Sequence, residues 1–288
     1  MDGQLFKRLY RRLLEIASLC RSPRQQYSDL VIVAVYLWGV IHDRPQGWGC
    51  LAENWTIDIP WMELPSESRL SRRLNTPLVK ALLDQINDYL WGRFRTRIAK
   101  CVDGKALTVS KSSKDKTATI GPAAGGRLTK GYKLHAIVDG GGVLAAWAIA
   151  PLNHSEPIVA RRLIRKLVGQ GYLIGDSNYD CNALYTRAGG YGHELVAPPK
   201  VKGKGLGHHV HSKYRLRGLE LLKQPMAKGL FKLRKSTIER FFGNLGWKSG
   251  GLGQLPGFVR SIKRVRRWVQ GKLILQAISM EKSLELQQ

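Results

Sequence analysis

Three acidic residues stand far apart in a strongly basic chain: Asp103, Asp176 and Glu239. Each aspartate follows a short apolar run of the kind that forms buried strands, and Glu239 lies in a helical pattern. Two strand-end carboxylates at one edge of a sheet repel each other unless a cation lies between them. Carboxylate oxygens are ligands that Mg²⁺ and Mn²⁺ accept. The spacing therefore predicts a divalent metal site, with Glu239 as the third carboxylate.

Each aspartate also has a local explanation, because Asp at a strand end is more often a turn residue or a helix cap than a ligand. Asp139 precedes three glycines, which predicts a hairpin turn. Asp180 precedes a helical pattern that begins near residue 181, which predicts a cap. We therefore assign neither of these two to the metal site.

The residues after Lys100 predict the sheet that must position the aspartates. Strand-like runs and helical patterns alternate there, which is typical of a mixed sheet covered by helices and predicts an α/β fold. The expected strands are 101–103, 106–110, 132–139, 143–150, 172–175 and 194–197. The expected helices are 156–168, 181–188, 236–247 and a long basic helix that follows residue 257.

The first hundred residues predict an all-helical region. Helical apolar spacing covers residues 4–20 and 27–40, and Pro77 opens a further helix that extends to about residue 97. Between them a short helix begins at Ser66 or Ser68, either of which is a good cap. We expect two domains, residues 1–98 and residues 99–288.

The charge of the chain points to a polyanionic partner. Its 288 residues carry 47 Lys and Arg against 21 Asp and Glu, a formal net charge of +26. Between Pro199 and Arg267 there are 18 basic and two acidic residues. Residues 199–230, rich in Lys, Gly and His, predict a basic loop or insertion. This excess favours nucleic acid over a small acidic substrate, with an affinity that falls steeply with salt.

Membrane and secreted classes fit poorly. The longest apolar stretch, 30–41, is too short to span a bilayer, which takes about 20 residues. No signal peptide opens the chain, so we expect a cytoplasmic protein without a membrane partner. The four cysteines contain no Cys-x-x-Cys pair, which disfavours structural zinc and a disulfide framework.

The motifs resemble a known family. Val-Asp-Gly-Lys at Asp103, Lys-Gly-Tyr-Lys-Leu-His from Lys130, Gly-Asp-Ser-Asn-Tyr-Asp at Asp176 and Ile-Glu-Arg-Phe-Phe-Gly-Asn-Leu at Glu239 occur in order. They resemble the DDE transposases of bacterial insertion sequences, in the insertion-sequence-four and -five superfamily. The resemblance covers about residues 100–280. It implies a ribonuclease-H-like core, in which the three acidic residues are catalytic and bind Mg²⁺ or Mn²⁺, with two ions expected.

The same resemblance suggests DNA contacts. Some relatives carry Tyr, Arg and Lys at minus seven, minus four and plus seven from the last Glu; here these positions are Lys232, Lys235 and Gly246, and Lys248 lies two residues farther on. The helical region 1–98 resembles a DNA-end-binding or dimerising region. The predicted DNA-binding residues are Lys105, Lys130, Lys133, Arg234, Lys235, Arg240, Lys248, Arg69, Arg72 and Arg73.

The predicted function is metal-dependent cleavage and strand transfer at the ends of an insertion sequence. Its partners would be double-stranded DNA, as terminal inverted repeats and target, and a second copy of the chain on DNA. The setting would be the nucleoid of a prokaryotic cytoplasm. Two alternatives stay open: a catalytically inactive nucleic-acid-binding protein, and a ribonuclease-H-like nuclease that hydrolyses without joining.

Overall fold

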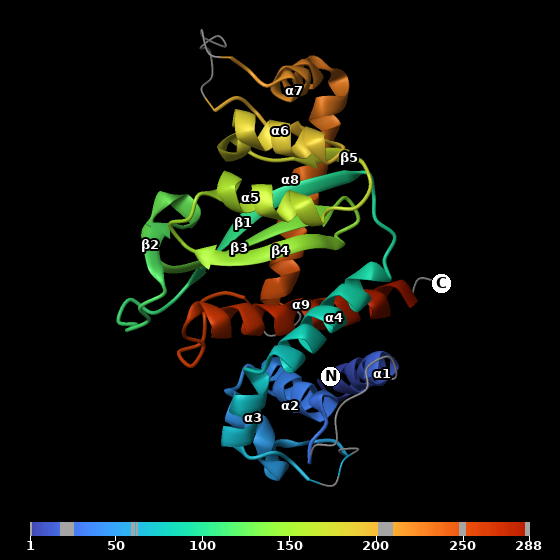
Figure 1. Ribbon diagram of the computed structural model, residues 1–288, viewed down its shortest axis with the longest axis vertical. Coiled ribbons are helices and arrows are strands. Elements are labelled where there is room, and N and C mark those ends of the chain that lie inside the picture. Colours follow the sequence, from blue (N-terminus) through green and yellow to red (C-terminus); the bar gives the residue numbers. More distant parts are fainter. Residues whose placement is uncertain are drawn as a thin grey trace. The chain divides into compact units, whose positions relative to one another are not determined.

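The fold consists of two compact units (Figure 1). A computed structural model describes residues 2–17, 26–58, 61, 63–200, 210–247 and 252–285. The helical unit comprises Met1–Arg93 and Asn244–Gln288, and the sheet unit comprises Phe94–Gly243. The helical unit is thus built from both ends of the chain.

Five long helices form the described part of the helical unit. They are α1 (Asp2–Ala17), α2 (Asp29–Ile41), α3 (Glu67–Leu74), α4 (Pro77–Gly92) and α9 (Ile262–Glu285), with short 3₁₀ turns at Gln46–Cys50 and Ala52–Asn54. Ser28, Ser66 and Thr76 each accept a hydrogen bond from the backbone N–H three residues on, which caps α2, α3 and α4. Of the two serines that the sequence proposed for α3, Ser66 is therefore the cap.

The longest apolar stretch of the sequence forms α2. Residues 32–41 of this helix are all buried, so α2 is a core helix of the helical unit. Its 13 residues are too few to span the roughly 30 Å hydrocarbon core of a bilayer. None of the helices in the described ranges is long and apolar enough to cross a membrane.

The C-terminal helix α9 packs against α2. A Cβ added to Gly271 would lie 3.1 Å from Val40 Cγ1, which shows how closely the two backbones approach. Lys272 is fully buried, and its Nζ donates to Val40 O at 2.9 Å and to Asp43 Oδ1 at 2.6 Å. These contacts differ from the expected domain boundary: residues 244–288 group with the N-terminal helices and not with the sheet, because the apolar face of α9 is buried there.

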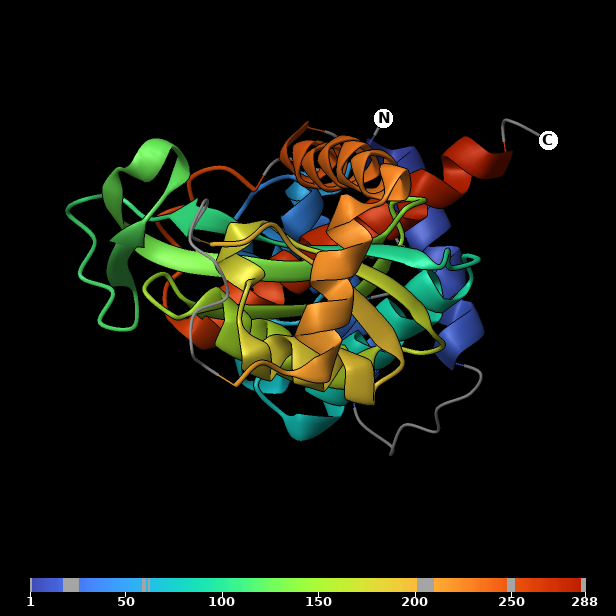
Figure 2. The ribbon, with the colours of Figure 1, turned by 90° about the horizontal axis from the view of Figure 1, so that it is seen from above.

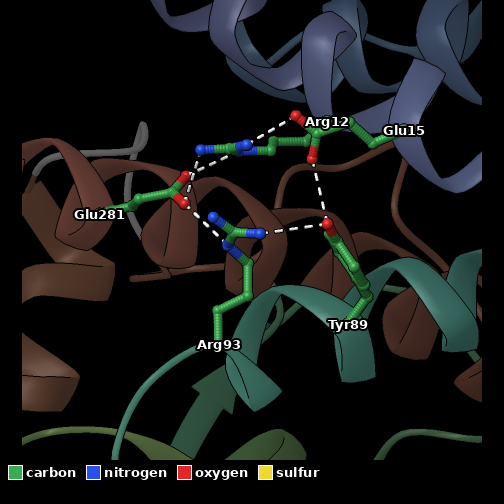
Figure 3. Close-up of polar contacts among 5 residues, drawn as sticks. All are labelled: Arg12, Glu15, Tyr89, Arg93 and Glu281. Carbon is green, nitrogen blue, oxygen red and sulfur yellow. Dashed lines mark hydrogen bonds and ion pairs between the residues drawn. The ribbon is translucent and has the colours of Figure 1, made fainter.

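A polar network links α1, α4 and α9 (Figure 3). Arg12 donates to Glu281 through Nε and Nη2 at 3.1 and 2.9 Å, and to Glu15 at 2.6 Å. Arg93 donates to the same Glu281 at 3.0 Å and to the hydroxyl of Tyr89, which in turn donates to Glu15. Two guanidiniums thus share one carboxylate, and three segments far apart in sequence are fastened together.

The sheet unit contains a six-stranded mixed sheet. Its strands are β1 (Ala99–Thr108), β2 (Thr119–Pro122), β3 (Leu128–Asp139), β4 (Leu144–Pro151), β5 (Gly171–Ile174) and β6 (His193–Val196). The order is β2-β3-β1-β5-β6, and β4 also pairs with β3. β3 is antiparallel to β1 and β4, whereas β5 is parallel to β1 and β6. This arrangement confirms the predicted α/β class, a mixed sheet flanked by helices.

Helices cover both faces of this sheet. They are α5 (Glu156–Leu163), α6 (Asn182–Gly190), α7 (Lys213–Lys223) and α8 (Pro225–Trp247), the last of which runs out of the sheet unit at its end. Figures 1 and 2 show α5 and α6 on one face and α8 on the other. Alternation along β1 and β3 decides which side chains meet which helix. Val102 and Ile137 belong to the buried core that also contains Val159 and Leu184 of α5 and α6.

The turn between β3 and β4 has the predicted form. Asp139 Oδ1 accepts hydrogen bonds from the backbone N–H of Gly141 and Val143, at 2.8 and 2.9 Å. Its Oδ2 accepts another from Arg97 N at 2.6 Å. Asp139 is therefore a turn residue, as its position before three glycines indicated.

Much of the predicted basic insertion is helical. Residues 201–209 lie outside the described residues, but 213–223 form α7 and 225–230 begin α8. α7 packs closely, since a Cβ on Gly218 would lie 2.6 Å from Leu195 O of β6. Tyr214 packs against the core, Gly218 makes the close approach and Leu221 is buried, so one helical face points inward. The loop prediction for 213–230 is wrong because the many basic residues obscured the helical spacing of these inward-facing positions.

Candidate active site

Asp103 lies within β1 and not at its end. The strand continues to Thr108, and the two runs expected at 101–103 and 106–110 are one strand. Gly104 does not turn the chain; it leaves space on the other face, where an added Cβ would lie 2.9 Å from Lys133 Cδ. The prediction of a strand end at Asp103 is therefore corrected, whereas the carboxylate remains partly accessible, with 26% of its side chain exposed.

Asp176 lies two residues beyond the end of β5. Parallel pairing places Cys101 of β1 opposite Ile174 of β5, which brings the two aspartates to neighbouring positions. Asp176 also accepts a hydrogen bond from Asn178 N at 2.8 Å and so caps the 3₁₀ turn Ser177–Tyr179. It serves as a local cap while it faces Asp103.

Arg234 of α8 joins the two aspartates. Its Nη2 lies 3.0 Å from Asp103 Oδ2 and 3.7 Å from Asp176 Oδ2. Because both distances end on one nitrogen, these carboxylate oxygens can be no farther apart than the sum of the two. The sequence assigned Arg234 to DNA and a metal ion to the place between the aspartates. In this structure the guanidinium supplies the counter-charge there.

The electrostatics of Asp103 indicate a demand for positive charge. Burial raises the pKa of its carboxyl to about 6, and the negative charges of Asp176 and Glu156 add to the rise. The charge of Arg234 opposes the rise, as does the hydrogen bond from Gly104 N at 2.8 Å. One guanidinium thus compensates only part of the cost of two neighbouring carboxylates. Their hard oxygen donors fit Mg²⁺ or Mn²⁺ in charge and in ligand type.

Glu239 does not join this pair in the structure. It is exposed on α8, five residues after Arg234, and five residues turn a helix by well over one full turn. Of the buried residues of α8 near Glu239, Thr237, Ile238 and Phe241 lie about 100° or more around the helix from it, and Phe242 lies about 60° away. Within the described ranges, no group of three or more His, Cys, Asp or Glu side chains is close enough to hold a metal ion. The structure thus brings together two of the three predicted ligands.

The basic residues predicted beside the strands have different surroundings. Lys105 Nζ donates to Phe242 O of α8 at 3.3 Å and lies over the Phe242 ring. Lys105 and Asp103 therefore lie on the face of the sheet that α8 covers. Lys130 Nζ donates to Ser113 O at 2.8 Å. Lys133 is buried on the opposite face, where it pairs with Glu156 at 2.6 Å. Lys133 is therefore a structural cation, because alternation along β3 turns it away from the aspartates.

The other predicted DNA contacts are more exposed, with one exception. Lys235, Arg240 and Arg72 are exposed. Arg69 is partly exposed, lies over the Tyr27 ring and donates to Gln26. Arg73 pairs with Asp29 and donates to Tyr27 O, so it holds α3 to α2. Lys248 lies outside the described residues.

Two residues near the aspartates had not been predicted. Tyr179 is fully buried, and its hydroxyl has no hydrogen-bond partner among the described residues. Burial raises its pKa well above the usual value, and the charges of Glu156, Asp103 and Asp176 add to the effect. An added Cβ on Gly175 would lie 2.9 Å from Tyr179 Cβ, so the motif Gly-Asp-Ser-Asn-Tyr carries a packing signal. Nothing local in the sequence marks Glu156.

Asp180 differs from the prediction as well. The cap position of α6 belongs to Cys181, which makes no side-chain cap. Asp180 instead accepts two hydrogen bonds from Arg215 of α7, at 2.8 and 2.9 Å, and one from Lys200 N. The cap prediction fails because a cation 35 residues away reaches this buried carboxylate.

Comparison with known proteins places the site in a family context. Residues 95–249 match the family described as "Transposase DDE domain", a span that is more than half of the chain. No curated protein matches the sequence. Among solved structures, the chain is similar to piggyBac transposase in a cryo-EM synaptic complex with hairpin DNA, with a TM-score of 0.37 and 11% identity. The match covers 70% of this chain and spans about half (49%) of that chain.

Proposed function

The chain belongs to the Transposase DDE domain family, and from this premise we propose that it cleaves and joins DNA at the ends of an insertion sequence. We place it in the insertion-sequence-four and -five superfamily of prokaryotes. The observation that carries the proposal is the pair of aspartates joined at Arg234 inside the matched span. The net charge of +26 supports a DNA partner.

Asp103 and Asp176 are the proposed metal ligands, and Glu239 is the proposed third carboxylate. Two ions of Mg²⁺ or Mn²⁺ held there would activate water or a 3′-hydroxyl and stabilise the leaving oxygen. Arg234 keeps the two aspartates close by sharing one guanidinium nitrogen between them. Its planar fork also suits a phosphate, so we assign it to the DNA strand at the site.

The remaining DNA contacts follow from exposure. Lys235, Arg240 and Arg72 are exposed cations and Arg69 is a partly exposed one, and we assign them to phosphates. Lys105 and Lys130 each donate to a backbone carbonyl, and we propose that each turns to a phosphate when DNA binds. Lys248 remains a proposed contact. Buried Lys133 and paired Arg73 leave the set.

The test uses a plasmid that carries the DNA from both sides of the reading frame. Wild-type protein with Mg²⁺ should nick at the boundaries of the element, and the freed 3′-ends should appear joined to a second plasmid. Asp103→Asn and Asp176→Asn should bind the same DNA and lose detectable cleavage, because each substitution removes a proposed metal ligand. Asp84→Asn, an exposed aspartate paired with Arg266, is the matched control. Full cleavage by Asp176→Asn would refute the proposal.

The role of Glu239 is tested by a separate pair of variants. Glu239→Gln should abolish cleavage, while Glu220→Gln, another exposed glutamate of the sheet unit, should leave it unchanged. Equal activity of the two variants would remove Glu239 from the proposed ligand set. Nicking without joining would assign the protein to hydrolysis alone.

A second candidate function is DNA binding without cleavage. The observation that favours it is the exposed position of Glu239, outside any three-residue metal-binding group of the described residues. A protein of this kind would bind the terminal repeats and give no nicks with Mg²⁺ or Mn²⁺.

We also propose a dimer on DNA, because one copy of the chain at each end would couple the cleavage of the two ends. Sedimentation of the protein with and without a terminal-repeat duplex measures this. Two protein copies per pair of ends is the expected stoichiometry; one copy bound to both ends would contradict it.

A further inference from the structure

A small pocket opens in the helical unit. Its volume is about 170 Å³, below the roughly 300–1,000 Å³ of pockets for drug-sized ligands, so it takes a single small group. All of its lining residues belong to this unit. They come from α2, the segment that follows α2, α3, the loop before α9 and the start of α9. The site therefore lies outside the pair of aspartates in the sheet unit.

Arg267 lines this pocket as a buried cation. Only 7% of the residue is exposed, and its Nη2 donates to the amide oxygen of Asn75 at 2.7 Å. Its other N–H groups donate to no described residue, and none of these nitrogens is enclosed by protein atoms, so they open into the pocket. A buried guanidinium that lacks a counter-charge is costly, and an anion in the pocket would offset that cost.

The chain itself does not supply this counter-charge. Arg267 forms no ion pair with any described residue, and the segments outside the described ranges contain no Asp or Glu. Glu285, whose side chain is not described, lies about five turns farther along the same helix. Glu67 lines the pocket, but it is exposed, and its carboxyl lies against Gly47, where an added Cβ would be 2.5 Å from Glu67 Cδ. The remaining source of negative charge is a ligand.

Arg264 and Tyr36 add donors to the same pocket. Arg264 is exposed and lies three residues before Arg267, so the two side chains share one face of α9. Burial lowers the pKa of Arg267, the Tyr36 hydroxyl opposes this shift and the charge of Arg264 adds to it, so all three groups lie within electrostatic reach. The Tyr36 hydroxyl donates to no described residue. Two guanidiniums and a hydroxyl together favour an anion with several acceptor oxygens.

The walls of the pocket limit the shape of its occupant. Lys272 Nζ lies over the ring of Trp268, 5.1 Å from the ring centroid, and Phe258 packs edge-on against Trp268 with centroids 5.4 Å apart. Trp268 is therefore a fixed wall with no ring face open to a ligand. A ring has no place to stack there, whereas a compact tetrahedral oxyanion matches both the volume and the donors.

We propose that this pocket binds one phosphate group, held by the guanidiniums of Arg267 and Arg264 and by the hydroxyl of Tyr36. Donors from two helices, α2 and α9, line the pocket, and a phosphate offers them more oxygens than a carboxylate does. The group comes either from the backbone of DNA or from free inorganic phosphate. The DNA source rests on the proposed function, whereas the phosphate site itself does not.

The first experiment titrates the whole chain with sodium phosphate at constant ionic strength, with EDTA present, and follows the melting temperature and the heat of binding. Phosphate at about ten times its Kd should raise the melting temperature of the wild type by about 3–6 °C. Arg267→Met should abolish this response. Arg266→Met removes the same charge from an exposed neighbour paired with Asp84 and should keep it. No response in the wild type, or an equal loss in both variants, would overturn the inference.

Two further titrations test the second cation and the shape of the ligand. Arg264→Gln should weaken phosphate binding about threefold, as expected for an exposed charge. Lys263→Gln, at a neighbouring exposed position that does not line the pocket, should leave the Kd unchanged. Equal effects of the two substitutions would refute a site with two guanidiniums. Acetate that binds as tightly as phosphate would assign the pocket to a carboxylate and refute the phosphate.

Competition decides the source of the phosphate. If a backbone phosphate of DNA occupies the pocket, free phosphate should no longer bind once the protein is saturated with a duplex from beside the reading frame. Arg267→Met should then also weaken duplex binding. Phosphate binding that the duplex leaves unchanged would assign the site to free phosphate.

The two proposals fail separately. Protein that binds phosphate through Arg267 but neither binds nor cleaves DNA would refute the proposed function and leave the pocket in place. Protein that cleaves DNA but shows no response to phosphate would refute the pocket alone.

Discussion

Two arginines occupy opposite electrostatic situations in the two units. In the sheet unit, Arg234 serves two carboxylates, and burial still raises the pKa of Asp103 to about 6. In the helical unit, buried Arg267 donates to an amide oxygen and has no carboxylate partner in the part of the chain that the structure describes. The first site has too little positive charge and the second too little negative charge. A cation suits the one and an anion the other, so each imbalance indicates the sign of a ligand.

The difference matters because the chain as a whole carries so much positive charge. A net charge of +26 predicts a polyanion but does not say where it binds. An exposed cation is solvated, so it costs little free energy without an ionic partner. A buried cation has lost its water, so the lack of a partner is costly. Burial therefore distinguishes Arg267 from the many surface cations around it.

The largest effect should come from the removal of Arg234. Arg234→Gln leaves Asp103 and Asp176 without their shared cation and should lower the free energy of unfolding by about 3–5 kcal/mol, because one partner of a mostly buried ion pair is removed. Mg²⁺ or Mn²⁺ should then raise the melting temperature of the variant more than that of the wild type. Exposed Lys235→Gln is the control and should stay within about 0.5 kcal/mol of wild type. If metal has no larger effect on Arg234→Gln, the aspartates are not short of positive charge.

Replacement of buried Arg267 should change the stability in the opposite direction. Arg267→Met keeps most of the volume and removes the uncompensated charge, so the free protein should be equally stable or more stable by up to about 4 kcal/mol. Arg266→Met, which breaks an exposed pair with Asp84, should change stability by less than about 1 kcal/mol. Chemical denaturation measures both. A clear loss of stability in Arg267→Met would mean that its bond to Asn75 outweighs its burial, and the contrast with Arg234 would fail.

A buried histidine in the sheet unit makes a pH-dependent comparison. Burial, and then the charges of Lys133 and His154, lower the pKa of His135 to about 3 in the folded protein. Between about pH 6.5 and 3 the unfolded chain therefore binds a proton that the folded chain does not, so stability falls as pH falls through this window. The slope should reach about 1.4 kcal/mol per pH unit. His135→Leu should reduce the slope, and His193, whose pKa burial also lowers, should account for part of the remainder. An unchanged slope would contradict the assignment.

The smallest effects should come from single exposed cations. Arg240→Gln and Lys235→Gln should each reduce the slope of log affinity for duplex DNA against log salt by about 0.9, the value for one phosphate contact. Buried Lys133→Met should leave the slope unchanged, because its charge is matched by Glu156. Binding titrations at several salt concentrations give the slopes. An equal change in all three would show that net charge alone, and not exposure, governs the contacts.

Local patterns in the sequence were sufficient for most elements. Ser66 caps α3, Asp139 makes the hairpin turn, and the predicted strands and helices after residue 99 occur in order, although β2 was not predicted and β1 joins two predicted strands. Such features depend on residues within a few positions of one another. Asp103 and Asp176 could also be paired from the sequence, since Asp103 lies on β1, Asp176 lies two residues after β5, and these two strands proved to be neighbours.

The sequence-based predictions that failed did so for a different reason. Gly104 resembled a turn but lies inside β1, because its missing side chain serves packing on the other face. α7 was hidden by its basic residues, although Gly218 and Leu221 pack inward. Asp180 resembled a helix cap in the sequence, but in the structure its carboxylate accepts a hydrogen bond from Arg215 of α7. In each case a tertiary partner outweighed the local preference.

By itself, the sequence determined the α/β class and the strongly positive net charge, and it predicted that two carboxylates lie at neighbouring strands. Periodicity, turn chemistry and charge all act over short distances or as totals, so they can be read without coordinates. Only the tertiary structure decided that α9 joins the N-terminal helices, that Arg234 lies between the aspartates and that Arg267 is buried with no carboxylate partner among the described residues. These outcomes depend on which faces exclude water together, and residues more than a hundred positions apart meet only when the whole chain has packed.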